Sequence, residues 1–98
     1  MPENVIKRNG TVQAFDIHRI ETAVRKAMSR TKEQDKTLPI TVAKNVTQQL
    51  SGRAKTPTVD EIHTLVENEL MRQNKFDVAR EYITYRDRHK PDICLLYT

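Results

Sequence analysis

The stretch that decides the fold is VIKRNGTVQAFD, residues 5–16. It contains two short β-prone runs, residues 5–8 and 11–15, which are separated by Asn9 and Gly10. Because a type I′ turn needs a positive φ at both central positions, Asn-Gly between such runs predicts a β-hairpin with a two-residue loop. A two-stranded sheet is marginally stable by itself, so we expect the hairpin to pack on the rest of the chain.

Two helices are predicted between residues 16 and 52. Asp16 is the expected N-cap of the first helix, which continues through Arg30. After a polar loop, Pro39 suits the first turn of the second helix, and Gly52 is expected to end it. Apolar residues at helical spacing should form the buried side of this second helix: Ile40, Val42, Ala43, Val46 and Leu50.

Two more helices are predicted after residue 57. Thr58 and Glu61 have the spacing of a capping box, and Asn74 is expected to end the helix that it starts. Asp77 should cap the last helix, which Pro91 prevents from continuing. These elements predict an α+β fold, a small β-hairpin sheet capping a four-helix bundle. We expect residues 1–90 to form one domain and residues 91–98 to be a tail of uncertain structure.

The positive charge is concentrated in the first half of the chain. The protein has 98 residues and a formal net charge of +4, and residues 1–49 carry nine Lys and Arg against five Asp and Glu. Residues 50–98 carry eight of each. This asymmetry fits an anionic partner, such as a nucleotide phosphate, a nucleic acid or an acidic protein, and it equally fits a solvated basic surface.

Several classes of protein are excluded by what the sequence lacks. No run of 18 apolar residues and no secretory signal is present, and Cys94 is the only cysteine, so we expect a cytoplasmic protein without a disulfide framework. A glycine-rich phosphate loop and a catalytic triad are missing. His18, His63 and His89 do not have metal-ligand spacing, so no protein-built metal site is expected. A domain of this kind is predicted to bind rather than to catalyse.

The hairpin and the residues after it carry the candidate binding groups. Lys7 and Arg8 beside the turn either protect an exposed sheet edge or form a phosphate clamp, with Lys as a point charge and Arg as a two-pronged donor. Strand alternation would place them on opposite faces unless the turn is bulged. Phe15 and Asp16 are either a core residue and a helix cap, or a ring and a carboxylate that hold a flat base.

Four motifs in order resemble those of the ATP-cone family. Residues 5–10 and 15–20 resemble its opening hairpin and first helix start, residues 58–70 its third helix, and residues 78–88 its closing Val-Ala-x-x-Tyr-Ile-x-Tyr-Arg pattern. The resemblance covers about residues 4–90 and is most like the N-terminal regulatory cone of an anaerobic (class III) ribonucleoside-triphosphate reductase. It implies that the chain binds ATP or dATP as an allosteric ligand, accompanied by Mg²⁺.

The resemblance also implies a set of nucleotide-binding residues. Lys7 and Arg8 would hold the triphosphate, Asp16 would read the adenine amine, and His63 would lie near the phosphates or sugar. The residues expected to enclose the adenine, together with Asp16, are Val5, Gln13, Phe15 and Ile20. Further phosphate contacts are expected from Arg86 and Arg88. Many cones carry Glu where this chain has Gln13.

These implications favour an ATP- and dATP-sensing regulatory domain without catalytic residues of its own. It would control the activity or the oligomerisation of a ribonucleotide reductase, with the catalytic domain or subunit as its partner and a homo-oligomer as a further state. The alternatives are an assembly or transcription-regulator module and a small nucleic-acid-binding domain. Nucleic acid is the less favoured partner, because no helix is rich in basic residues and stacking aromatics are few.

Overall fold

The computed structural model describes residues 3–53 and 55–88, with side chains as far as Arg86. Its elements follow in the order β1 (Asn4–Ile6), β2 (Val12–Ala14), α1 (Ile17–Met28), α2 (Leu38–Ser51), α3 (Val59–Arg72) and α4 (Phe76–Arg88). In the described part of the chain the predicted α+β fold is confirmed, with a two-stranded antiparallel sheet and four helices. The predicted tail with Cys94 lies outside it.

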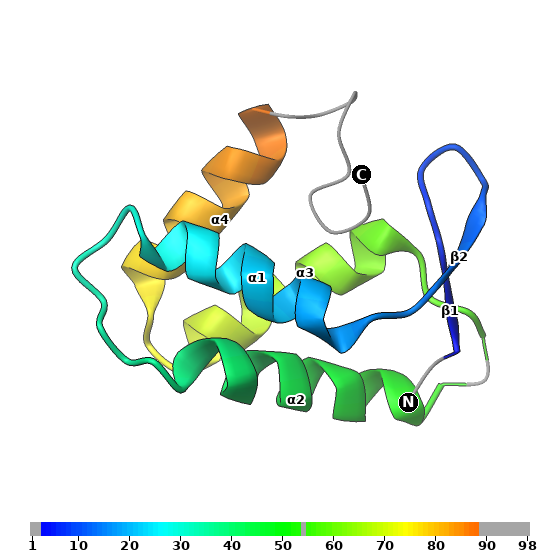
Figure 1. The fold of residues 1–98 in the computed structure, drawn as a ribbon, viewed down its shortest axis with the longest axis horizontal. Coiled ribbons are helices and arrows are strands. Elements are labelled where there is room, and N and C mark those ends of the chain that lie inside the picture. The colour runs from blue at the N-terminus through cyan, green and yellow to red at the C-terminus, as the bar shows by residue number, and fades with distance from the viewer. Residues whose placement is uncertain (1–2, 54, 89–98) are drawn as a thin grey trace.

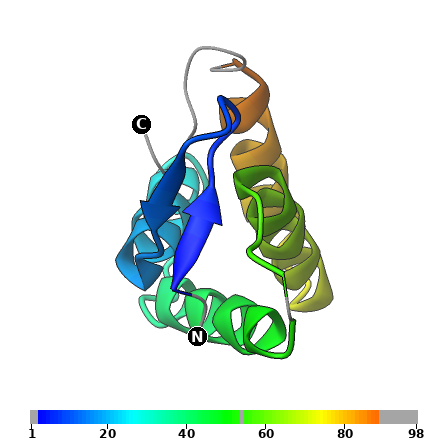
Figure 2. The same cartoon turned by 90° about the vertical axis from the view of Figure 1, so that its right-hand side faces the viewer.

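The four helices surround one core, and the hairpin closes one end of it. The main helix contacts join α1 to α2 and α4, and α3 to α2 and α4, so each helix packs against two others. Figure 1 shows α2 running along one side of the bundle and the hairpin at the end where α2 finishes. Seen from that end, the two strands lie between α1 and α3, with α2 below them (Figure 2). The largest fully buried side chains are led by Tyr82, Ile20, Leu38, Ile62 and Leu70.

The hairpin is anchored to the bundle through β1. Val5 is completely buried and belongs to the core. On the edge of β1 that faces away from β2, the N–H of Ile6 donates to the carbonyl of Pro57 at 2.9 Å, and Ile6 forms a parallel bridge with Thr58. The hairpin is therefore joined to the segment that leads directly into α3, and this union satisfies backbone groups that a free edge would leave to water.

The turn of the hairpin differs from the predicted type I′ turn. Ile6 lies opposite Val12, the N–H of Lys7 donates to Thr11, and the N–H of Gly10 donates to Lys7. Gly10 has a φ of 86°, whereas Asn9 is not among the described residues with positive φ. The loop thus has three residues, 8–10, in the pattern of a turn followed by a left-handed glycine. The prediction of a two-residue loop was wrong, because the loop is one residue longer. Arg8 therefore lies in the loop and not in the first strand.

Two of the predicted helix caps are confirmed by their hydrogen bonds. A carboxylate oxygen of Asp16 accepts from the N–H of His18 at 2.9 Å, before α1. The hydroxyl of Thr58 accepts from the N–H of Glu61 at 3.1 Å, and the Glu61 side chain accepts from the N–H of Thr58 at 3.4 Å, which completes the capping box of α3. Both caps satisfy N–H groups that a helix start leaves without acceptors.

The predicted cap of α4 was wrong. α4 begins at Phe76, so Asp77 lies inside its first turn, where a carboxylate interacts favourably with the helix dipole. The reason is the tight connection after α3, in which Asn74 takes a φ of 62° and the N–H of Lys75 donates back to Leu70 at 2.9 Å. This helix-terminating motif reverses the chain so quickly that Phe76 is already helical.

The predicted buried side of α2 needs one correction. Ile40 is 54% exposed, while Leu38 and Pro39 are buried together with Val42. Residues 38 and 39 lie one helical turn before Val42, but Ile40 lies two residues before it and so points to another side of the helix. Gly52 does end α2, although its φ of −84° is one that any residue adopts.

Replacing Thr58 with alanine should lower the free energy of unfolding by about 1 kcal/mol, because the first turn of α3 loses its side-chain acceptor. Urea unfolding followed by circular dichroism measures this change. Thr22→Ala on α1 is the matched control, since its exposed hydroxyl donates within its own helix to the carbonyl of His18, and we expect a change below about 0.5 kcal/mol. Equal losses in the two variants would contradict the role of the capping box.

Candidate functional site

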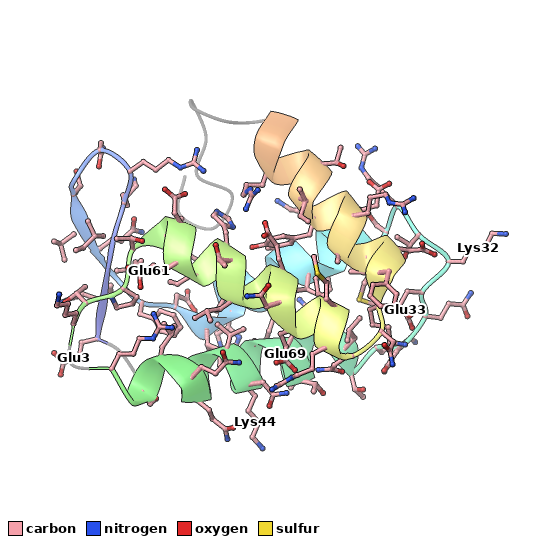
Figure 3. The ribbon with its side chains drawn as sticks, turned by 180° about the vertical axis from the view of Figure 1, so that it is seen from behind. Glu3, Lys32, Glu33, Lys44, Glu61 and Glu69 are labelled. Atoms are coloured by element: carbon pink, nitrogen blue, oxygen red, sulfur yellow. The ribbon has the colours of Figure 1, made fainter. Side chains whose placement is uncertain are left out.

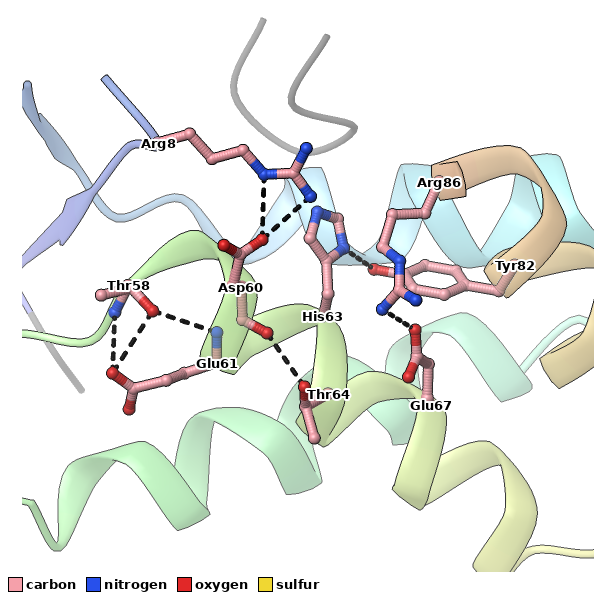
Figure 4. Close-up of polar contacts among 9 residues, drawn as sticks. All are labelled: Arg8, Thr58, Asp60, Glu61, His63, Thr64, Glu67, Tyr82 and Arg86. Atoms are coloured by element: carbon pink, nitrogen blue, oxygen red, sulfur yellow. Dashed lines mark hydrogen bonds and ion pairs between the residues drawn. The ribbon is translucent and has the colours of Figure 1, made fainter. Parts of the chain in front are cut away.

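The hairpin loop delivers Arg8 to the first turn of α3. Its Nε and Nη2 atoms lie 3.0 and 2.9 Å from the same carboxylate oxygen of Asp60 (Figure 4). The Arg8 side chain is 21% exposed and that of Asp60 is 63% exposed. The third nitrogen, Nη1, is buried and has no hydrogen-bond partner among the described residues. Arg8 is therefore turned toward α3.

One turn further along α3, His63 is fully buried. Its Nδ1 atom lies 2.7 Å from the hydroxyl of Tyr82 on α4, and Figure 4 shows its Nε2 atom on the side of Arg8. Nε2 is buried without a hydrogen-bond partner in the described part of the chain. When Tyr82 donates to Nδ1, the neutral ring carries its proton on Nε2 and offers a donor beside the guanidinium.

His63 is held in its neutral form. Burial, followed by the positive charges of Arg86 and Arg8, lowers the pKa of His63 from 6.5 to about 4, while the negative charge of Asp60 opposes this shift. Two cations from different elements, the hairpin loop and α4, are thus close enough to act on the same imidazole. At neutral pH the ring adds no charge to this cluster.

Arg86 on α4 forms the second ion pair of the site. Its Nη1 atom contacts the carboxylate of Glu67 on α3, and the two side chains are 23% and 12% exposed. Arg8, His63 and Arg86 were all predicted as nucleotide-binding residues, and the structure brings these three together along one side of α3. We refer to them, with Asp60, Glu67 and Tyr82, as the guanidinium–imidazole cluster.

The residues expected to enclose an adenine lie at the base of the hairpin and the start of α1. Val5 and Ile20 are completely buried in the core, and Phe15 is partly buried against it. Gln13 lies opposite Val5 in the sheet, and Asp16 is exposed at the cap of α1. Contact of these residues with a base stays a prediction. Lys7 is half-buried beside the turn, and the side chain of Arg88 lies outside the described residues.

Three members of the cluster, Asp60, Glu67 and Tyr82, were missed from the sequence. Asp60, His63 and Glu67 recur at helical spacing, so they share one side of α3, and this polar stripe was the available signal for both acids. Tyr82 is completely buried in the core, as an apolar residue of α4 would be, but its hydroxyl contacts and orients the imidazole. Among the described residues, no three His, Cys, Asp or Glu side chains are grouped as a metal site.

His63 should make the fold sensitive to acid. Its folded pKa of about 4 lies below the unfolded value of 6.5, so the unfolded chain binds more protons between these values. The stabilisation is complete above pH 6.5 and is lost as the pH falls toward 4, by on the order of 3 kcal/mol. Urea unfolding at pH 7, 5.5 and 4 measures this loss.

The matched control is His63→Gln, which keeps a polar side chain at the position but does not titrate. Its stability should fall less steeply between pH 6.5 and 4 than that of the wild type. Identical slopes in the two proteins would show that His63 titrates normally. An NMR titration of the His63 ring in the wild type gives the folded pKa directly, without unfolding the protein.

Comparison with known proteins places the chain in a family. The family model of the ATP cone domain matches residues 3–91. A vitamin B12-dependent ribonucleoside-diphosphate reductase of Mycobacterium tuberculosis is 45% identical over 87 residues, which are 89% of this chain and 12% of the reductase. An anaerobic ribonucleoside-triphosphate reductase of Escherichia coli is 38% identical over 93 residues, which are 95% of this chain and 13% of that protein.

A third kind of relative is the ribonucleoside-diphosphate reductase subunit alpha of Chlamydia trachomatis, which is 33% identical over 99 aligned residues. The chain spans about an eighth of the length of the first two relatives. None of the helices described is both long and apolar enough to cross a membrane. The family model matches the chain from the hairpin to beyond the end of α4. The chain therefore belongs to the ATP-cone domain family.

Proposed function

We propose that this chain is a sensor of ATP and dATP that regulates a ribonucleotide reductase. ATP-cone domains are allosteric nucleotide-binding regions, and all the relatives named above are ribonucleotide reductases. The observation that carries the proposal is the convergence of Arg8, His63 and Arg86 from three different elements. Two guanidinium groups and a buried imidazole, whose Nε2 atom has no hydrogen-bond partner among the described residues, are well suited to a polyphosphate, which presents many acceptor oxygens and three to four negative charges.

The proposed binding mode divides the nucleotide between two regions. The triphosphate lies along the guanidinium–imidazole cluster, with Lys7 as an additional point charge near the turn. The adenine lies at the base of the hairpin, against Phe15 and within reach of Gln13 and Asp16. Mg²⁺ accompanies the phosphates and takes its ligands mostly from the nucleotide and water. The excess positive charge of the first half of the chain favours the approach of such an anion.

Discrimination between ATP and dATP depends on a single 2′-hydroxyl group. One such hydrogen bond contributes about 1–3 kcal/mol, which is modest for a switch. A regulatory response therefore needs the two nucleotides to favour different shapes of the domain or different assemblies. We propose that the controlled partner is the catalytic domain or subunit of the reductase, and that assembly is the property that changes.

Calorimetric titration of the chain with ATP tests the binding mode. Lys7→Ala and Arg8→Ala should each weaken binding about tenfold or more, because each removes a cation that contacts phosphate. Lys44→Ala removes the same charge from the exposed side of α2, well away from the hairpin (Figure 3), and should change the affinity less than about twofold. Absence of heat with both ATP and dATP in the wild type would refute nucleotide binding, and an equal loss in Lys44→Ala would refute the assigned residues.

The regulatory part of the proposal is tested by the mass of the assembly. Multi-angle light scattering of the chain without nucleotide, with ATP and with dATP should give a different mass for at least one nucleotide. A nucleotide that binds in calorimetry but leaves the mass unchanged in both cases would argue against control through oligomerisation of this domain. A dimer that forms without binding either nucleotide would instead favour an assembly module.

A further inference from the structure

We propose that Asp60 and Glu67 act as internal counterions which a polyphosphate replaces, so that these two carboxylates set the affinity of the site. This inference rests on the proposed nucleotide binding and adds a role that the cations alone do not have. In the structure each guanidinium group of the cluster is already paired with an acid from α3. A phosphate that approaches Arg8 or Arg86 therefore competes with a carboxylate that is tethered to the same domain.

The Arg8–Asp60 pair has the geometry of a contact that opens easily. The Nε and Nη2 atoms of Arg8 contact the same oxygen of Asp60, which leaves the other carboxylate oxygen outside the contact. Asp60 is 63% exposed, so its carboxylate can return to water with little loss of solvation. Ion pairs with such exposure contribute only about 0–1 kcal/mol. A phosphate group that meets the same guanidinium through two oxygens forms the stronger contact.

The Arg86–Glu67 pair is more enclosed, with side chains 23% and 12% exposed. Separating it takes more free energy than opening an exposed pair, because a partly buried carboxylate loses its charged partner. A ligand must therefore supply a full negative charge at Arg86 to replace Glu67. Since the two pairs involve separate guanidinium groups on either side of His63, a chain of phosphates is needed to replace both (Figure 4).

The unpartnered atoms explain why a polyphosphate does better than the carboxylates. Nη1 of Arg8 and Nε2 of His63 are both buried and without hydrogen-bond partners among the described residues. Leaving such buried groups unsatisfied costs free energy. Asp60 accepts hydrogen bonds from only two of the three guanidinium nitrogen atoms of Arg8. Each phosphate, in contrast, offers several oxygen atoms in different directions. Replacement of the acids thus adds hydrogen bonds that the internal pairs cannot make.

Calorimetry of Asp60→Asn and Glu67→Gln, with ATP, AMP and inorganic tripolyphosphate as ligands, tests this exchange. Removing an internal competitor should tighten ATP and tripolyphosphate by about fivefold in Asp60→Asn and about tenfold in Glu67→Gln. AMP should gain less than about twofold, because one phosphate cannot span both guanidinium groups. The matched control is Glu33→Gln, which breaks a 3.0 Å ion pair with Lys75 at the other end of the molecule (Figure 3) and should change no affinity more than about twofold.

The outcomes separate this inference from the proposed function. If the wild type binds neither ATP nor tripolyphosphate, nucleotide binding itself is refuted and the exchange with it. If the wild type binds ATP but the two variants bind it equally or less tightly, only the exchange is refuted, and the acids would instead hold the arginines in place for the ligand. A crystal structure of the ATP complex gives the direct reading: the Arg8–Asp60 and Arg86–Glu67 contacts should be open, and their persistence would overturn the inference.

Discussion

The site depends on the docking of β1 against the segment that leads into α3. Three residues in each strand are too few for a stable two-stranded sheet, so the hairpin relies on the burial of Val5 and on the hydrogen bond from Ile6 to Pro57. Because Pro57 directly precedes the capping box of α3, this bond carries the hairpin loop to the first turn of that helix. The contact between Arg8 and Asp60 is a consequence of where the sheet is attached.

Electrostatics then determines the charge state of the cluster. A fully buried imidazole between two guanidinium groups is held neutral, since burial and both positive charges oppose its protonation. The two acids on α3 offset the cations, so the fold does not hold uncompensated charge against its core. Because each guanidinium group is already paired with a carboxylate, an anion that approaches the cluster competes with Asp60 or Glu67 for it.

The features that were predicted correctly depend on neighbours within a few residues. Asp16 and Thr58 cap helices because their partners are the N–H groups of His18 and Glu61, two and three positions away. Two of the missed features are equally local, but the residues that form them fit more than one geometry. Asn-Gly fits both a two-residue and a three-residue loop, and the hydrogen bond from Lys7 to Thr11 belongs to the longer one. The early start of α4 follows from how abruptly the chain reverses at Asn74.

The sequence by itself determined the elements, their order, two of the helix caps, the family and three residues of the cluster, because local hydrogen bonding and side-chain periodicity act over short stretches. Tertiary structure alone decided that Asp60 and Glu67 neutralise the cations and that Tyr82 orients His63. The helical spacing of Asp60, His63 and Glu67 shows that they share one side of a helix, but it does not show their partners, which lie 52 or 19 positions away. Such contacts exist only after the hairpin and the helices have packed around their common core.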